Sequence, residues 1–469
     1  MLDLFLLSFV LAFLGAGLRR PFFFVLAYAY IDIVAPQKVA WGFLTQIPVS
    51  LIAFIGAVVT WAFVDDKRGT RVSWRQGLIV MLLVYCYLTT QTADYADSAA
   101  TKWDWVWKAL VFAAFLPLTL RTRLRIEALA LVMVLSVASI VIDGGLKTLA
   151  SGGGGYGELK LLVDENTGLY EGSTLSMVAV AVIPLAIWLA RHGTVFAPGK
   201  LVTAFVALLG FACVLIPVGT QTRTGLLCIG LLAVMSLRTV KHRFAYTAAI
   251  ALAAAIALPL LPDSYTKRMD TIQNHQSDQS ASTRLAVWAW TWDYAKDHPF
   301  GGGFNSFLGN HIKIELVTSD KTSANTEATT SSETTDKARA FHSSYFEMLG
   351  EQGYPGLLMW LVLQISGVWQ MERLRARWRK RGGADDPAGP GRDAWIAPLA
   401  VALQQAQVVY LTGSLFVGIA YQPFVYMLVA LQIGLVGFAG QLDARRPPEP
   451  RIVPTRRPAR RRAAEPAEA

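Results

Sequence analysis

Residues 201–237 read LVTAFVALLGFACVLIPVGTQTRTGLLCIGLLAVMSL. Two apolar runs, expected as spans near 200–217 and 221–237, meet at the polar link GTQTRTG. A helix of about 17–25 residues crosses the hydrocarbon layer of a bilayer. A spanning segment must satisfy its own backbone hydrogen bonds, and a helix does so within itself. The stretch therefore predicts two membrane-spanning helices joined by a tight turn that carries one arginine, Arg223.

The same apolar pattern recurs along the whole chain. Of its 469 residues, 54% are hydrophobic and 16% are charged, whereas roughly a quarter of a soluble domain is charged. We predict an all-α polytopic membrane protein with about 12 or 13 transmembrane helices and one large periplasmic loop. The short run 21–35 decides between the two counts. The other expected spans lie near 2–18, 47–64, 77–90, 105–119, 124–142, 174–190, 244–261, 344–368, 395–416 and 422–438.

Basic residues lie mainly in the short loops between these runs. The net charge of +10 therefore indicates membrane topology and not binding of nucleic acid. With thirteen helices, the basic loops and the tail from Arg445 to Arg462 fall on one side, which the positive-inside rule makes cytoplasmic. The N-terminus and the large loop Pro262–Phe341 are then expected on the outer side.

The chain divides into five predicted parts. These are the N-terminal transmembrane helices 1–142, the central helices with the arginine motif 143–261, the large periplasmic loop 262–341, the C-terminal transmembrane helices 342–440, and a disordered basic cytoplasmic tail 441–469. The tail is rich in Pro, Arg and Ala, and we expect it to lie on anionic membrane lipid.

The large loop is the only expected subdomain outside the membrane. Ser282 is expected to cap a helix over Thr283–Asp297, which His298-Pro299 ends. The three glycines at 301–303 predict a sharp turn. Residues Thr318–Thr335 are almost all polar and are expected to be mobile.

Arg223 is the first candidate for binding an anion. It lies at the outer start of a spanning helix, where backbone N–H groups and the helix dipole favour negative charge. Arginine near a membrane span is costly and usually has a function. The alternative is that Arg223 only extends to the interface. The polar residues on both sides, including Gln221, favour the functional reading.

Arg284 is the second candidate. It is expected in the first turn of the loop helix, where the dipole disfavours a cation, so that a bound anion or Asp278 must offset the cost. Three tryptophans follow it. They fit either an interfacial belt or a surface for sugar rings or a lipid tail, and they are Trp288, Trp290 and Trp292.

His342 is the third candidate, at the outer start of the next span. An imidazole there is suited to act as a base near neutral pH; the alternative is a surface histidine at a loop end. Glu347 and Glu351 lie one helical turn apart and share a face. They are possible supporting residues, with a structural ion pair or hydrogen bond as the alternative. Gly350, Gly353 and Gly356 form a face of small residues suited to helix packing.

Several familiar signals are missing from the sequence. The cysteines Cys86, Cys213 and Cys228 all fall in apolar segments and suggest neither a disulfide framework nor a metal site. There is no phosphate-binding Gly-Lys-Ser/Thr loop, and Asp94 with Asp97 is a weak pair. We predict no metal and no cofactor.

Taken in order, these motifs resemble the O-antigen ligase and polymerase family of membrane glycosyltransferases. The resemblance rests on TQTRTGLL at Thr220–Leu227, DQSASTRLAVW at Asp278–Trp288, HPFGGGFNSF at His298–Phe307 and FHSSYFEMLGEQGYPGLL at Phe341–Leu358. The N-terminal stretch Arg19–Phe43 is similar to one branch, the O-glycosylation ligases associated with exosortase A. The long insert at 318–335 departs from the family pattern and bears on acceptor recognition.

The resemblance implies a reaction and roles for three residues. Such enzymes sit in the bacterial inner membrane with the active site facing the periplasm. They move a glycan from undecaprenyl diphosphate to a hydroxyl of a glycan, lipid or protein acceptor, without a metal ion. Carried over by motif, Arg223 and Arg284 would bind the donor diphosphate, and His342 would assist transfer.

Three alternatives stay open at this stage. The family includes repeat-unit polymerases of exopolysaccharide as well as ligases. A transporter of lipid-linked sugars would also be polytopic and basic, but transporters tend to show internal repeats and broken helices near the midplane. The sequence shows neither feature. A scaffold without catalytic activity in an export complex is the third alternative.

Overall fold

The computed structural model describes residues 2–40, 42–151, 168–238, 279–321, 327–379 and 393–445, with isolated positions between 242 and 255. Helices dominate these ranges, which confirms the predicted all-α polytopic fold. Most of the expected span 244–261, Asp278 and the tail after Arg445 lie outside the described residues.

The helices follow the apolar runs of the sequence. The first half of the chain contains α1 Leu2–Arg19, α2 Phe22–Val34, α3 Pro36–Val39, η1 Phe43–Gln46, α4 Val49–Phe63, α5 Trp74–Gln91, α6 Ala96–Thr119 and α7 Arg123–Ser151. The second half contains η2 Gly168–Tyr170, α8 Gly172–His192, α9 Lys200–Gly219, α10 Arg223–Leu237, α13 Gln279–Asp297, η4 Ser306–Gly309, α14 Ser344–Arg379, α15 Ile396–Gly413 and α16 Pro423–Arg445.

Length and composition separate these helices into groups. Within the described ranges, α7, α8, α9 and α16 are long and apolar enough to cross a membrane, and α2, α4 and α10 are shorter apolar helices. Helices α5, α6, α14 and α15 pack in the same bundle but carry more polar residues. The sequence predicted a span in each of these positions.

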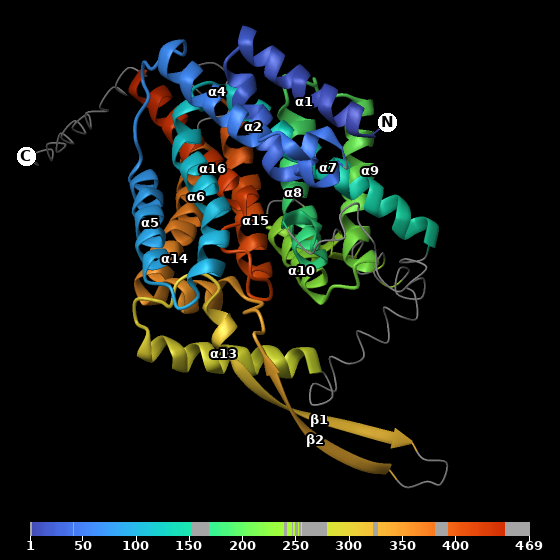
Figure 1. The fold of residues 1–469 in the computed structure, drawn as a ribbon. Helices are drawn as coiled ribbons and strands as arrows, with labels where there is room; N and C mark the ends of the chain where they lie inside the picture. The colour runs from blue at the N-terminus through green and yellow to red at the C-terminus, as the bar shows by residue number, and fades with distance from the viewer. Residues whose placement is uncertain are drawn as a thin grey trace, which may run out of the picture.

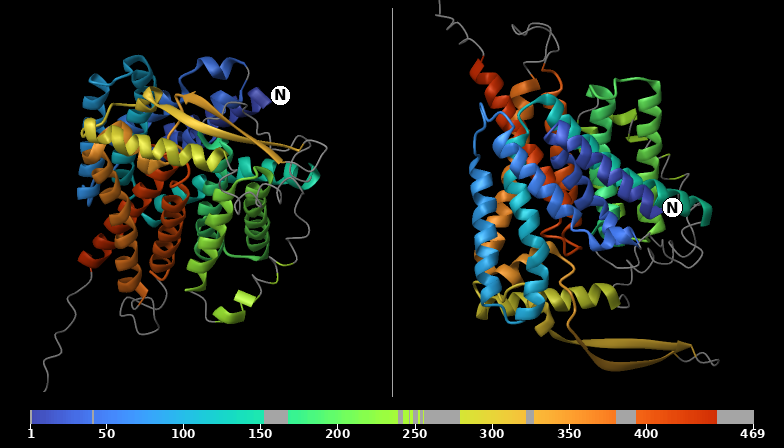
Figure 2. Two further views of the ribbon diagram at one scale, coloured as in Figure 1. Left: turned by 90° about the horizontal axis from the view of Figure 1, so that it is seen from below. Right: turned by 45° about the horizontal axis from the view of Figure 1, so that its top comes forward.

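The long helices form one bundle. Helices α5, α6, α14, α15 and α16 lie side by side, and α8 joins them to α7, α9 and α10 (Figure 1). Helix α13 lies across one end of this bundle, and a β-hairpin extends beyond it (Figure 2). We call this end the α13 end. The starts of α14 and α16 and the end of α15 meet there.

The opposite end of the bundle holds ion pairs between helix ends and loops. Arg125 Nη1 lies 2.6 Å from Asp65, and Arg377 pairs with Asp443 at 2.7 Å. These groups belong to loops that the sequence predicted as the basic side.

A chain of polar side chains links four helices inside the bundle. The Arg75 Nη2 donates to the carbonyl of Leu363 at 3.0 Å and to Gln432 at 2.9 Å. Gln407 hydrogen-bonds to Gln432 and Gln364. Such bonds between helices hold membrane bundles together where hydrophobic burial cannot. They fix α5, α14, α15 and α16 against one another beneath the α13 end.

The structure adds a β-hairpin to the large loop and contradicts the expected helix cap at Ser282. The polar insert forms strands β1 His311–Lys321 and β2 Glu327–Lys337, which pair in antiparallel register with His311 opposite Lys337. Its many threonines are β-branched and favour an extended chain, so polar composition alone was misleading. Helix α13 begins at Gln279, so Ser282 lies inside it and does not cap it.

Candidate active site at the α13 end

A glycine turn fixes the first segment of α14. The N–H of Gly302 donates to the carbonyl of Gly350 at 3.0 Å, and the N–H of Gly303 bonds to the next carbonyl at 3.0 Å. Gly353 has φ +62°, and a side chain there would meet the backbone of Pro299 and its neighbours. Glycine permits both the left-handed backbone and the close approach. Gly353 thus serves a backbone junction, whereas Gly350 lies close to Thr291 of α13 and Gly356 close to Tyr85 of α5, which agrees with the helix packing that the sequence suggested.

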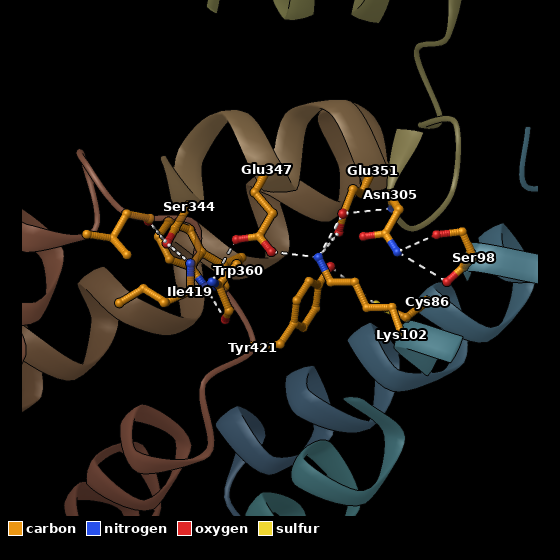
Figure 3. Close-up of polar contacts among 12 residues, drawn as sticks. Cys86, Ser98, Lys102, Asn305, Ser344, Glu347, Glu351, Trp360, Ile419 and Tyr421 are labelled. Carbon is orange, nitrogen blue, oxygen red and sulfur yellow. Dashed lines mark hydrogen bonds and ion pairs between the residues drawn. The ribbon is translucent and has the colours of Figure 1, made fainter. Parts of the chain in front are cut away.

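This junction places Glu347 and Glu351 around one lysine. The Lys102 Nζ lies 2.6 Å from Glu347 Oε1 and 2.7 Å from Glu351 Oε1 (Figure 3). Glu351 also accepts the N–H of Asn305 at 2.9 Å, and Glu347 accepts the N–H of Ala420 at 2.9 Å. One side chain from α6 therefore joins both acidic residues of α14. We call these three charged side chains the Lys102 cluster.

The Lys102 cluster is almost completely removed from solvent. Its side chains are 12%, 7% and 0% exposed for Lys102, Glu347 and Glu351. A buried charge is costly unless it is paired and hydrogen-bonded, and every carboxylate oxygen here accepts a hydrogen bond. The structural ion pair considered for the two glutamates is therefore present, with a partner that the sequence analysis did not identify.

A polar pocket opens beside this cluster. Its volume is about 360 Å³. It is lined by Thr101, Lys102, Trp105, Asn305, Glu347, Gly418, Ile419, Tyr421 and Gln422. The lining comes from α6, from Asn305 before η4, from the start of α14 and from the link between α15 and α16. We call it the polar pocket.

His342 lies immediately before α14 and next to this pocket. Its φ is +48°, a left-handed backbone that is uncommon for residues other than glycine. Ser344, two residues on, anchors the segment, because its N–H donates to the Ser414 carbonyl at 2.8 Å and its hydroxyl donates to the Val417 carbonyl at 2.9 Å. The start of α14 is therefore tied to the α15–α16 link.

Charged groups around His342 affect its pKa. Desolvation by the surrounding chain lowers the pKa of His342, although part of the side chain remains exposed, and Arg284 and Arg339 lower it further. Glu171 acts in the opposite direction. Arg284 and His342 are 58 positions apart in the sequence, yet the positive charge of Arg284 acts on His342 and favours the neutral imidazole.

Arg284 lies on α13, but not where the sequence predicted. The helix begins at Gln279, so Arg284 is beyond the first turn and the dipole effect on it is weak. Trp288 is the first of the three tryptophans that follow Arg284. Its indole N–H donates to the Phe341 carbonyl at 2.9 Å, and its ring stacks on that of Phe346 with centroids 5.0 Å apart. Trp288 therefore fastens α13 to the start of α14, which is a structural role.

The other two tryptophans differ from Trp288. Trp290 stacks on Tyr294 with ring centroids 4.8 Å apart, on α13 itself. Trp292 is 53% exposed. The exposed ring remains consistent with the interfacial position that the sequence suggested.

Arg223 opens α10 at the same end of the bundle, as predicted. Before it, Gln221 has φ +51° and is buried. The hydroxyl groups of Thr220 and Thr222 each lie 2.8 Å from that of Ser176 on α8. The start of α10 is therefore fixed against the first turn of α8.

Glu171 connects this region to His342. It caps α8 by accepting the N–H groups of Ser173 at 3.0 Å and Thr174 at 2.6 Å. It is also one of the charges that influence His342. The helix start that carries Arg223 therefore packs on the first turn of α8, and Glu171, which caps that turn, also acts electrostatically on His342. Whether the two arginines face one cavity remains a prediction.

The sequence analysis did not single out several residues of this site. They are Lys102 and Trp105 on α6, Asn305 before η4, and Gln422 before α16, so they come from three segments far apart in the chain. The available signal was Lys102, a cation at the edge of an apolar run, which is costly in a membrane protein. Among the described residues, no group of three or more His, Cys, Asp or Glu side chains is placed to hold a metal ion.

Comparison with known families divides the chain into two regions. Residues 1–194 match a family of unknown function, DUF5935. Residues 208–361 match the family described as O-antigen ligase. This second region contains Arg223, Arg284, His342, Glu347 and Glu351. No curated protein matches the chain.

Proposed function

Because residues 208–361 match the family described as O-antigen ligase, we propose that this chain is a glycosyltransferase of the periplasmic membrane face. It moves a glycan from undecaprenyl diphosphate to an acceptor hydroxyl. Its site lies at the α13 end, and Arg223, Arg284 and His342 carry the reaction. The exosortase-associated branch is part of this proposal and rests on the resemblance of Arg19–Phe43 alone; the match of residues 1–194 is to a family of unknown function.

One observation carries the proposal most strongly. Burial lowers the pKa of His342, and Arg284 is the largest charged contributor in the same direction. A diphosphate is an anion that guanidinium groups bind through paired hydrogen bonds. A neutral imidazole beside a cationic region suits a reaction in which an anion leaves and a hydroxyl loses its proton.

The proposed step is a single displacement at the anomeric carbon. The acceptor oxygen forms a bond to that carbon while the bond to the diphosphate oxygen breaks, and the diphosphate departs with the electron pair. The proton of the acceptor hydroxyl passes to His342. Arg223 and Arg284 stabilise the charge on the leaving diphosphate, as fixed cations do in a site shielded from water.

The proposal includes two further features. The opposite end of the bundle carries the basic loops, so the α13 end faces the periplasm by the positive-inside rule. The reaction also proceeds without a divalent metal, because arginines occupy the phosphate-binding role. Purified protein with lipid-linked donor should keep its turnover in excess chelator. Complete loss that Mg²⁺ or Mn²⁺ restores would contradict this part.

The lipid-linked glycans that accumulate in a deletion strain test the transferase function and distinguish a ligase from a polymerase. Loss of a ligase should leave long glycan chains on the lipid carrier, whereas loss of a polymerase should leave single repeat units there. Complementation with the wild-type chain should restore the product, and the His342→Ala variant at equal membrane level should not. Unchanged lipid-linked and polymeric glycans in the deletion strain would reject a transferase role.

A further inference from the structure

The polar pocket differs in charge from the region around His342. Besides burial, Arg284 and Arg339 lower the pKa of His342, and Glu171 raises it. In the polar pocket the charge of Lys102 is compensated by Glu347 and Glu351, at 2.6 and 2.7 Å. The pocket therefore offers no excess positive charge to a diphosphate. Its character suits an uncharged group that carries hydroxyls.

The lining of the polar pocket also suits such a group. Trp105 is 44% exposed and presents an aromatic ring at the pocket. Within the described part of the chain, the Gln422 side chain makes no hydrogen bond, so its amide can donate and accept. An aromatic surface packs against the apolar face of a sugar ring, while a few fixed polar groups orient its hydroxyls.

The pocket lies directly beside His342. Gly418 is part of its lining, and a side-chain carbon added there would lie 3.5 Å from the Glu347 carboxylate and 3.9 Å from the backbone nitrogen of His342. One glycine therefore separates the pocket from the backbone of His342. Its volume of about 360 Å³ lies at the small end of the usual range for small-molecule sites, roughly 300–1,000 Å³.

From this placement we infer that the polar pocket is the acceptor subsite and that it takes one sugar residue of a saccharide acceptor. The inference rests on the proposed transferase function and adds the location and chemical class of the acceptor. The sugar packs on Trp105, and the Gln422 amide and the Glu347 carboxylate bind its hydroxyls. One hydroxyl then reaches the base His342 from the side opposite to the cationic donor region.

Separate titrations of acceptor and donor test this subsite. The full-length protein in proteoliposomes would receive lipid-linked glycan extracted from a deletion strain and, as acceptor probe, the saccharide fraction of that strain's envelope. Trp105→Ala and Gln422→Ala should each raise the apparent KM for the saccharide about tenfold, the effect of one lost contact. The KM for the donor should not change.

A neighbouring tryptophan provides the matched control. Trp107 lies on the same helix but lines a different, mostly apolar groove with Leu83 and Val111, so Trp107→Ala should leave both KM values unchanged. An unchanged acceptor KM in Trp105→Ala and Gln422→Ala, with active wild type, would overturn the subsite. Product that a protease destroys would overturn the saccharide class.

A binding measurement decides the case independently of turnover. The native cysteines are buried, whereas Thr101 is an exposed residue of the pocket lining, so Thr101→Cys provides a single reactive thiol for an impermeant maleimide. The saccharide fraction should slow its labelling at least several-fold, and the lipid-linked donor should not. If wild type transfers no glycan, the proposed function fails, and protection still supports the pocket. Equal labelling with and without saccharide would reject the pocket even in an active enzyme.

Discussion

His342, Gln221 and Asn305 share an unusual backbone. Their φ angles are +48°, +51° and +57°, although none is a glycine. Such conformations cost of order 1–3 kcal/mol and persist where the surrounding structure holds them, often at functional sites. All three lie at the ends or links of elements that meet at the α13 end. The strain therefore marks the same region as the charged residues.

The role of His342 can be tested while its backbone is preserved. Asparagine tolerates the left-handed conformation, so His342→Asn should insert and fold like wild type. It should lose roughly 10²–10⁴ of the transfer rate, the usual contribution of a general base, yet still bind the lipid-linked donor. The measurement is single-turnover transfer in proteoliposomes. Near-wild-type transfer by His342→Gln would remove the base assignment but not the family.

The surroundings of His342 also predict a pH dependence. Its lowered pKa keeps the imidazole neutral in more acidic solution, so kcat/KM should fall only below the ordinary value of about 6.5. Arg284→Gln removes a positive neighbour and should move this fall to higher pH. Glu171→Gln should move it to lower pH. Lys108→Gln is the control, because Lys108 is not among the charges that act on His342. If kcat/KM falls at the same pH in all three variants, the group that titrates is not His342.

At the scale of helices, the Lys102 cluster is the main connection between α6 and α14. Its members are 245 and 249 positions apart along the chain. The apolar runs predicted both helices, because hydrocarbon length constrains each run by itself. They could not predict which faces meet. The sequence therefore suggested an ion pair for Glu347 and Glu351, but it did not identify Lys102 as their partner.

Removing Lys102 should be more damaging than removing one of its partners. Lys102→Met leaves two buried carboxylates without their cation, and loss of one partner of a buried pair costs about 3–5 kcal/mol. Glu351→Gln leaves one cation with one carboxylate and should cost less. The melting temperature of detergent-solubilised protein should follow this order. Lys108→Met removes an exposed pair with Asp104 and should change little; an equal loss in all three variants would contradict this account.

At the scale of the molecule, composition and apolar runs predicted the bundle, and motif order predicted the family. The sequence could not predict the β-hairpin, since polar composition indicated a mobile chain and its threonines favoured strands. Nor could it place Trp105 and Gln422 in one pocket, because only the packed bundle brings α6 and the α15–α16 link together.

The orientation of the whole bundle is open to chemical labelling. Lys337→Cys, at the exposed end of β2, should react with an impermeant thiol reagent in cells with a permeabilised outer membrane, because the α13 end is proposed to face the periplasm. Arg71→Cys, in a basic loop, should react only after the inner membrane is broken. The reverse pattern would overturn the topology and the periplasmic site together.

The glycine turn against α14 has a consequence for amide hydrogen exchange. A run of three glycines in an outer loop would ordinarily exchange its amide protons quickly. Here the N–H groups of Gly302 and Gly303 donate to carbonyls of α14, and the N–H of Tyr354 donates back to Pro299 at 3.0 Å. These amides should therefore exchange as slowly as those of the helices, and peptides covering them should take up deuterium late. Fast uptake there would mean that this end of the bundle opens as a unit, which would give the lipid carrier and its glycan a route into the site.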